Sequence, residues 1–106
     1  MEALTPYIAV IFTSTRTEHH DSEYAFWSDQ MTTLVREQPG YLGHTSVRDP
    51  VTREGITVSY FADDEAAVAW KQVAQHEVAQ QMGREVFYSE YRVEVTTVFR
   101  TYRAMI

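Results

Sequence analysis

The feature of the sequence that most constrains its fold is the order of its apolar segments, some of which have the period of a helix and others the period of a strand. Apolar residues three or four positions apart predict helices, whereas β-branched and alternating runs predict strands. Strands are predicted for Tyr7–Thr15, Tyr41–Asp49, Ile56–Phe61 and Tyr91–Tyr102, and helices for the segments that begin near Asp21 and near Asp63. The order β-α-β-β-α-β predicts an α+β domain of the ferredoxin-like type.

The first predicted helix has clear boundary signals. Asp21 or Ser22 can accept hydrogen bonds from the first backbone N–H groups, which predicts an N-terminal cap. The pair Pro39-Gly40 ends the helix after Gln38, because the residue before proline avoids the helical conformation and glycine terminates helices. The apolar stripe of this helix is predicted to consist of Tyr24, Trp27, Met31, Leu34 and Val35.

The second predicted helix has an acidic start at Asp63-Asp64-Glu65 and ends or breaks at Gly83. Its apolar centre is predicted to consist of Ala67, Trp70, Ala74 and Val78. Between the second and third strands, Asp49–Gly55 is a polar turn. These two strands therefore form a hairpin.

The first strand is apolar on both of its sides. Ile8, Val10 and Phe12 line one face, and Ala9 and Ile11 line the other. Two helices on one face of a four-stranded sheet leave the other face open to solvent. A sheet that is apolar on both faces needs a second cover, and a second copy of the chain is the simplest one. The sequence therefore predicts a homodimer joined through the sheet faces.

The composition excludes several classes of function. The 106 residues fit one domain, residues 1–106. Lys and Arg number 9 against 15 Asp and Glu, for a formal net charge of −6, and no basic run occurs. Nucleic-acid binders need a basic stripe for the phosphates, so neither nucleic acid nor an anionic membrane is an expected partner.

The chain contains no cysteine, which excludes disulfides, thiolate metal sites and thiol nucleophiles. No apolar run approaches the roughly 18 to 20 residues that span a bilayer. The N-terminal residues lack the basic segment of a signal peptide. The cytoplasm is the expected location.

Five groups of residues, in this order, span nearly the whole chain. They are Tyr7-Ile8-Ala9-Val10-Ile11-Phe12-Thr13-Ser14, Gln38-Pro39-Gly40-Tyr41-Leu42-Gly43, Gly55-Ile56-Thr57-Val58-Ser59-Tyr60, Ala69-Trp70-Lys71 with His76, and Gly83-Arg84-Glu85 with Tyr88 and Tyr91. Together they resemble the antibiotic biosynthesis monooxygenase family, whose members are dimeric α+β barrels. The chain is most similar to the uncharacterised, haem-degrading-monooxygenase-like bacterial branch of that family.

The resemblance implies a monooxygenase-like protein that acts on an aromatic or quinol-type small molecule without a cofactor. The alternative is a non-catalytic dimer of the same fold that binds a small ligand or haem, and a third reading is a dimer of stress or assembly type with no chemistry. Well-studied branches place an asparagine on the first strand, and this chain has no asparagine. The haem-degrading branch would place its haem-ligating histidine at the position of Gln80, which counts against haem.

His76 is the candidate general base. On a regular helix, at about 100° per residue, it lies at the rim of the apolar arc that contains Trp70. A helix interruption between Gln75 and Gly83 would turn its ring into the space between helix and sheet. We expect it to be the only histidine that faces this space, and burial would keep it neutral near pH 7. The alternative is a histidine that faces solvent or caps the helix.

Four aromatic residues are candidates for the substrate-binding wall: Trp70, Tyr60, Trp27 and Tyr88. An indole in a helical stripe is usually a core residue with one edge available to a pocket. Tyr60 and its neighbour Ser59 face opposite ways on the third strand, so one of them looks toward the helices. The alternative for Tyr88, as for Tyr91, is packing at the edge of the sheet.

The remaining histidines have weaker claims. His19 and His20 are adjacent in a polar loop, where neighbouring side chains diverge and chelate poorly. His44 is expected to be exposed on the second strand. No pair of histidines four residues apart on a helix is present, and we expect no metal site.

Overall fold

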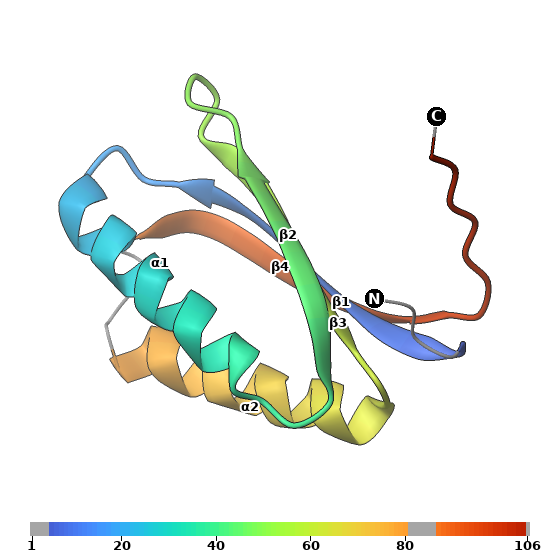
Figure 1. The fold of residues 1–106 in the computed structure, drawn as a ribbon. Helices are drawn as coiled ribbons and strands as arrows, with labels where there is room; N and C mark the ends of the chain where they lie inside the picture. The colour runs from blue at the N-terminus through green and yellow to red at the C-terminus, as the bar shows by residue number, and fades with distance from the viewer. Residues whose placement is uncertain (1–4, 81–86, 106) are drawn as a thin grey trace.

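The computed structural model describes residues 5–80 and 87–105. The described elements, shown in Figure 1, are β1 (Tyr7–Arg16), α1 (Asp21–Arg36), β2 (Tyr41–Arg48), β3 (Glu54–Phe61), α2 (Asp64–Gln80) and β4 (Tyr88–Val98). The predicted β-α-β-β-α-β order and the α+β class are confirmed. The expected helix end at Gly83 lies outside the described residues.

The four strands form one antiparallel sheet in the order β2-β3-β1-β4. Both helices lie on the same side of this sheet (Figure 1). In the two ladders of β1, Val10 lies opposite Ser59 of β3 and Val95 of β4. Because side chains alternate along a strand, the even-numbered residues of β1 face the helices and the odd-numbered residues face away.

The position of β4 differs from the prediction. The strand runs from Tyr88 to Val98, whereas the alternating pattern predicted Tyr91–Tyr102. The cause is β1, which continues to Arg16 and pairs there with Tyr88 across a register shift. Tyr88 therefore belongs to the sheet, and residues 99–102 lie beyond it.

The N-terminus of α1 is not capped as predicted. His20 occupies the cap position with a left-handed backbone (φ 63°) and makes no side-chain cap bond. The Asp21 carboxylate instead accepts hydrogen bonds from two arginines. Charge-assisted bonds to guanidinium groups are stronger than bonds to neutral backbone donors, so the ion pairs take precedence. The acidic start of α2 does form a cap, since Asp63 accepts the Ala66 N–H at 2.9 Å.

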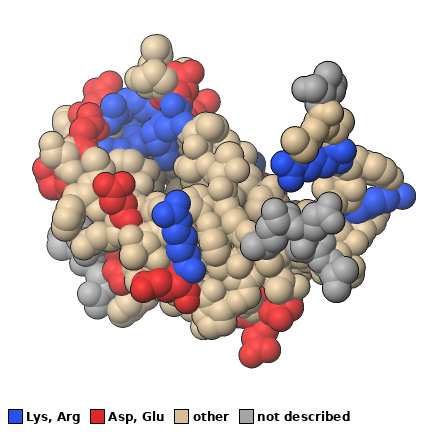
Figure 2. Space-filling model, viewed as in Figure 1, with Lys and Arg blue, Asp and Glu red and all other residues tan. Residues whose placement is uncertain are grey.

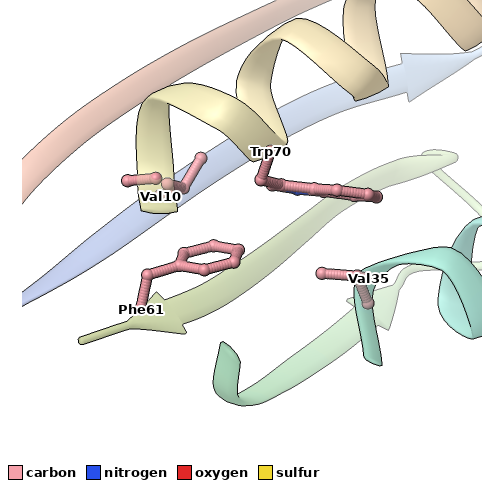
Figure 3. Close-up of a cluster of buried hydrophobic side chains, with 5 residues drawn as sticks. Val10, Val35, Phe61 and Trp70 are labelled. Carbon is pink, nitrogen blue, oxygen red and sulfur yellow. The ribbon is translucent and has the colours of Figure 1, made fainter. Parts of the chain in front are cut away.

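The main core lies between the two helices and the covered face of the sheet. Its buried residues are Val10, Val35, Phe61, Ala67 and Trp70, of which Phe61 is fully buried (Figure 3). They come from β1, α1, β3 and α2, so this one cluster joins both helices to the sheet. A second buried cluster consists of Trp27, Phe87 and Tyr88.

Gly40 permits the close approach of α2 to the turn between α1 and β2. Its backbone φ is +79°, and a Cβ atom at this position would lie only 2.8 Å from the Ala66 Cβ. Any other residue would strain the turn and push α2 outward. The predicted end of the first helix near Pro39-Gly40 thus has a packing reason as well as a conformational one.

The other face of the sheet carries apolar side chains that no described helix covers (Figure 1). Strand parity places there Tyr7 and Ile11 of β1 together with Ile56, Val58 and Tyr60 of β3. The rings of Tyr7 and Tyr60 are in contact, with centroids 5.8 Å apart. The two-sided apolar character expected of the sheet is therefore present in the structure.

Replacement of Trp70 with alanine should lower the free energy of unfolding by about 3–5 kcal/mol, the usual range for a large aromatic core residue. The indole is 8% exposed and belongs to the cluster that joins the helices to the sheet. Val68→Ala, on an exposed position of the same helix, is the control and should cost about 0.5 kcal/mol or less. Denaturant unfolding measures both, and a loss under about 1 kcal/mol for Trp70→Ala would contradict the core assignment.

Candidate functional site

A half-open cavity of about 160 Å³ lies between the two helices and the covered face of the sheet. Its aromatic lining consists of Phe12, Tyr24, Trp27, Trp70, Tyr88 and Tyr91. A cavity of this size, about 150 Å³, holds a single benzene ring in a protein interior. The arrangement therefore offers one aromatic ring a mostly apolar wall with polar groups at its edge.

The structure brings together three of the four predicted wall residues. Trp27, Trp70 and Tyr88 line the cavity. Tyr60 does not, and its expected place in the wall is wrong. Because Val10 pairs with Ser59, strand parity gives the helix-covered face to Ser59 and the opposite face to Tyr60.

His76 does not face the cavity. Its side chain is exposed, and it is absent from the described lining. The interruption expected between Gln75 and Gly83 does not occur as far as Gln80, where the described part of α2 ends. On a regular helix His76 is rotated by about 200° from Ala74, which lines the cavity, so its ring points away.

Among the described residues that line the cavity, the histidine is His44. The expectation that His44 is exposed is therefore wrong. It is half-buried, and its Nδ1 lies 2.6 Å from the Tyr41 hydroxyl. Burial lowers the pKa of His44, and the nearby charge of Arg36 lowers it further. The imidazole is therefore held neutral near pH 7.

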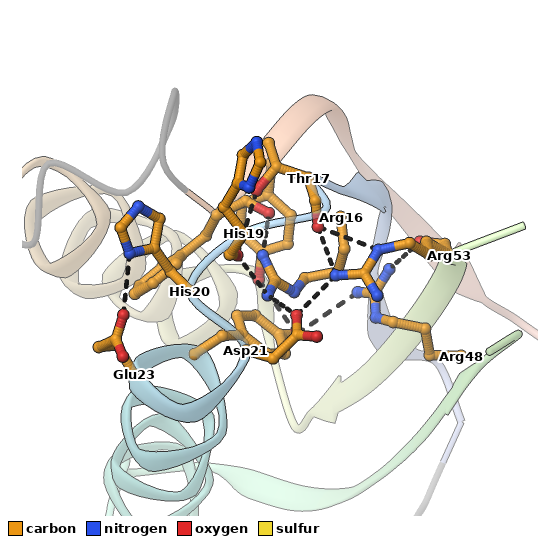
Figure 4. A network of polar contacts seen from close by, with 11 residues as sticks. Arg16, Thr17, His19, His20, Asp21, Glu23, Arg48 and Arg53 are labelled. Carbon is orange, nitrogen blue, oxygen red and sulfur yellow. Dashed lines mark hydrogen bonds and ion pairs between the residues drawn. The ribbon is translucent and has the colours of Figure 1, made fainter. Parts of the chain in front are cut away.

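Three arginines and one carboxylate form a polar network at one end of the sheet (Figure 4). The Arg16 side chain is only 2% exposed and donates to Asp21 Oδ1 at 2.7 Å and to the Phe87 carbonyl. Arg53 donates to the same Asp21 oxygen at 2.6 Å and to the Thr17 carbonyl. Hydrogen bonding from Arg53, reinforced by the charges of both arginines, lowers the pKa of Asp21.

Arg48 connects this network to the cavity, whose wall it helps to form. Its guanidinium donates to Ser14 Oγ at 2.8 Å and to the Arg53 carbonyl at 2.8 Å. It also lies 3.4 Å from the Tyr24 hydroxyl. This network was not predicted from the sequence, although Arg16 continues the inward alternation of Val10, Phe12 and Ser14, which was the available signal.

Tyr24 and Tyr88 supply hydroxyl groups beside Arg48. The Tyr88 hydroxyl donates to the Tyr24 hydroxyl at 3.4 Å. Burial raises the pKa of Tyr88, and the neighbouring Tyr24 raises it further. Tyr88 therefore stays protonated and can act as a hydrogen-bond donor, but not as a base.

The described part of the chain contains neither a metal-binding cluster nor a membrane-spanning helix. Across residues 5–80 and 87–105, no three His, Asp or Glu side chains lie close enough together to bind a metal ion. His19 and His20 are both exposed, with ring centroids 6.4 Å apart. Neither described helix is long and apolar enough to cross a membrane.

The fold matches that of several solved structures. The fold is that of antibiotic biosynthesis monooxygenase-like proteins, as the sequence resemblance predicted. A variant of SnoaB, a cofactor-independent oxygenase from Streptomyces nogalater, matches with a TM-score of 0.71 and 14% identity over 90% of this chain and 95% of that one. A candidate antibiotic biosynthesis monooxygenase from Bordetella bronchiseptica matches with a TM-score of 0.66 and 15% identity over 87% and 96%.

A relative in sequence is the uncharacterised protein YqjZ of Bacillus subtilis strain 168. The two are 42% identical over 95 residues, which is 90% of this chain and 82% of YqjZ. The chain belongs to the same family as YqjZ. No protein-family model matches the chain.

Haem does not fit this site. The haem-degrading branch would place its iron ligand at the position of Gln80, and an amide is not a ligand of that kind. The cavity has room for about one aromatic ring, whereas haem contains four pyrrole rings. Haem chemistry is therefore not assigned to this chain.

Replacement of Asp21 with asparagine should destabilise the protein near pH 7, because two guanidinium groups lose their shared carboxylate. The folded-state pKa of Asp21 is lowered from 3.8, so its contribution is complete above that value and is lost as the pH falls through the folded pKa. The difference from wild type should shrink below about pH 4.

Urea unfolding at neutral and acidic pH measures this difference. Asp29→Asn, an exposed residue of the same helix, is the control and should behave as wild type at both pH values. A difference between wild type and Asp21→Asn that does not change with pH would contradict the assignment.

Proposed function

We propose that the chain is a small monooxygenase-like protein that oxidises a phenol or quinol of one aromatic ring without a cofactor. The observation that carries this proposal is the ring-sized, aromatic-lined cavity with a neutral histidine in its wall. The similarity in fold to SnoaB, a cofactor-independent oxygenase, supports it.

The reaction requires no external reductant. A phenol with a free ring position reacts with O₂ to give a quinone and water. At the free ring position a C–O bond forms, the C–H and O–O bonds break, and one oxygen atom becomes the new carbonyl. The other oxygen atom leaves as water, with the phenolic proton and the proton lost from the ring carbon. The substrate supplies all four electrons that O₂ accepts. The protein's tasks are to bind and desolvate the ring, remove the phenolic proton and return a proton to the leaving oxygen.

His44 is the proposed base, in the place that the sequence analysis gave to His76. If its Nδ1–H donates to the Tyr41 hydroxyl, its Nε2 carries the free lone pair. Its lowered pKa keeps it ready to accept a proton. Trp27 and Trp70 are the proposed walls for the ring, and Tyr88 is a proposed donor to a substrate oxygen.

The alternative function is a binding protein that holds the same ligand without turnover. The size of the cavity supports both functions equally. Oxygen uptake distinguishes them, because a binding protein shifts its melting temperature with ligand but consumes no O₂.

Cell fractionation tests the cytoplasmic location that the sequence predicts.

The homodimer is part of this proposal. The apolar face away from the helices contains Tyr7, Ile11, Val58 and Tyr60, and no described element of the chain covers it. Beyond β4, the chain carries Phe99, Tyr102 and Met105 at 70%, 84% and 85% exposure, and Figure 1 shows this segment running away from the sheet. A second copy would cover both the face and the segment.

His44→Ala should reduce oxygen uptake with mono-aromatic phenols and hydroquinones about 10²-fold or more, the usual cost of losing a general base. His76→Ala, which removes an exposed histidine of α2, is the matched control and should keep wild-type rates. The rate of the wild type should fall only at a pH below 6.5, the ordinary pKa of histidine. Loss of uptake in His76→Ala with retention in His44→Ala would contradict the assignment.

Light scattering should give a mass of twice the 12.3 kDa chain at micromolar concentration. The interface should bury on the order of 1,600 Å² or more in total. Val58→Asp places a charge on the apolar face and should shift the mass toward the monomer. Val51→Asp, in the exposed turn between β2 and β3, is the control. A wild-type monomer at this concentration would overturn the proposal.

A further inference from the structure

The cavity has a charge opposite to that of the protein. Its described lining contains two cationic side chains, Arg48 and Lys71, and no Asp or Glu. The whole chain carries a formal net charge of −6. The described lining of the ring-sized cavity is therefore positively charged, although the protein as a whole is acidic.

Arg48 is held in place by neutral acceptors. Its guanidinium donates to the Ser14 hydroxyl and to the backbone carbonyls of Ser14 and Arg53, at 2.8, 3.3 and 2.8 Å. These bonds fix its position but leave its charge uncompensated, because no ion pair of Arg48 occurs among the described residues. Its neighbours Arg16 and Arg53 share the single carboxylate of Asp21 (Figure 4).

The chain makes room for this guanidinium. Gly55 of β3 lies opposite Arg48 in the ladder, and a Cβ atom at Gly55 would lie 2.5 Å from the Arg48 Cζ. The absence of a side chain there allows the guanidinium to lie against β3. Figure 2 shows Lys and Arg side chains gathered between the start of α1 and the hairpin of β2 and β3, with Asp and Glu at their edges. One group of positive side chains thus lies at this end of the cavity region.

We propose that the cavity binds an aromatic carboxylic acid, with the ring between Trp27 and Trp70 and the carboxylate at Arg48. A planar guanidinium matches a carboxylate in shape and charge, whereas a neutral ligand would leave the charge uncompensated. The buried Trp27 Nε1–H has no acceptor among the described residues. An oxygen substituent on the ring of the ligand would accept this hydrogen bond. This inference rests on the proposed function and adds the substrate class: a hydroxylated aromatic acid.

Benzoate and benzamide test the inference, because they share a ring and a similar shape but differ in charge. Titration calorimetry should show that the wild-type protein binds benzoate roughly tenfold or more tightly than benzamide, as expected for a charge-assisted pair. Arg48→Gln should remove most of this preference, while benzamide binding stays within about twofold. Arg36→Gln removes the same charge from α1 outside the cavity lining and should keep the preference.

Two further variants keep the test decisive if Arg48→Gln fails to fold. Arg48→Lys retains the charge but loses the planar fork, and should reduce the preference in part. Lys71→Gln changes an exposed helix position and should also reduce it. Circular dichroism reports folding of each variant.

The outcomes separate this inference from the proposed function. Equal binding of benzoate and benzamide by the wild type, or a preference that is undiminished in folded Arg48→Gln or Arg48→Lys, overturns the carboxylate site and leaves an aromatic-binding cavity. Failure of both compounds to bind overturns the site and the proposed function together. Benzoate preference without oxygen uptake on hydroxylated benzoates supports the site and overturns the enzyme.

Discussion

The alternation of side chains along β1 is the constraint on which the rest of the structure depends. This strand lies between β3 and β4 in the sheet, so both of its edges are paired with neighbouring strands along its length. On the helix-covered face it presents Val10, Phe12, Ser14 and Arg16 in turn. Val10 belongs to the core, Phe12 lines the cavity, and Ser14 and Arg16 belong to the polar network. Along the covered face of β1 the surroundings therefore change from the apolar core at Val10 to the buried charge of Arg16. The cavity lies between the core and the polar network.

The sequence was sufficient for the element order and the core, because those depend on periodicity. It was not sufficient for His44, because a local irregularity reverses parity in β2. The ladder between β2 and β3 shifts register between Tyr41 and Gly43, so one residue of β2 has no partner there. Tyr41 and His44 consequently share the inner face, although strict alternation would separate them. A bulge of one residue does not produce a recognisable apolar pattern, so it cannot be predicted from the sequence.

The errors over His76 and Asp21 have a different origin. His76 was expected to point inward because it lies at the rim of the apolar arc of α2, and an interruption that would turn it further inward does not occur before Gln80. Asp21 was assigned to a helix cap from local sequence, but its partners Arg16 and Arg53 come from β1 and from the turn before β3. Such contacts depend on which strands become neighbours. Local pattern therefore predicts helices and strands well, and predicts the polar contacts between them poorly.

The cavity and the uncovered face are two sides of the same strands. Ser59 lines the cavity, while the next residue, Tyr60, belongs to the opposite face with Tyr7. A partner chain on that face would press on β1 and β3, which also carry the cavity wall. The backbone between the two sites is only one strand thick, so covering the outer face would restrain the strands that position Phe12 and Ser59. The cavity and the outer apolar face therefore share β1 and β3, although single substitutions can address each face separately because neighbouring side chains point in opposite directions.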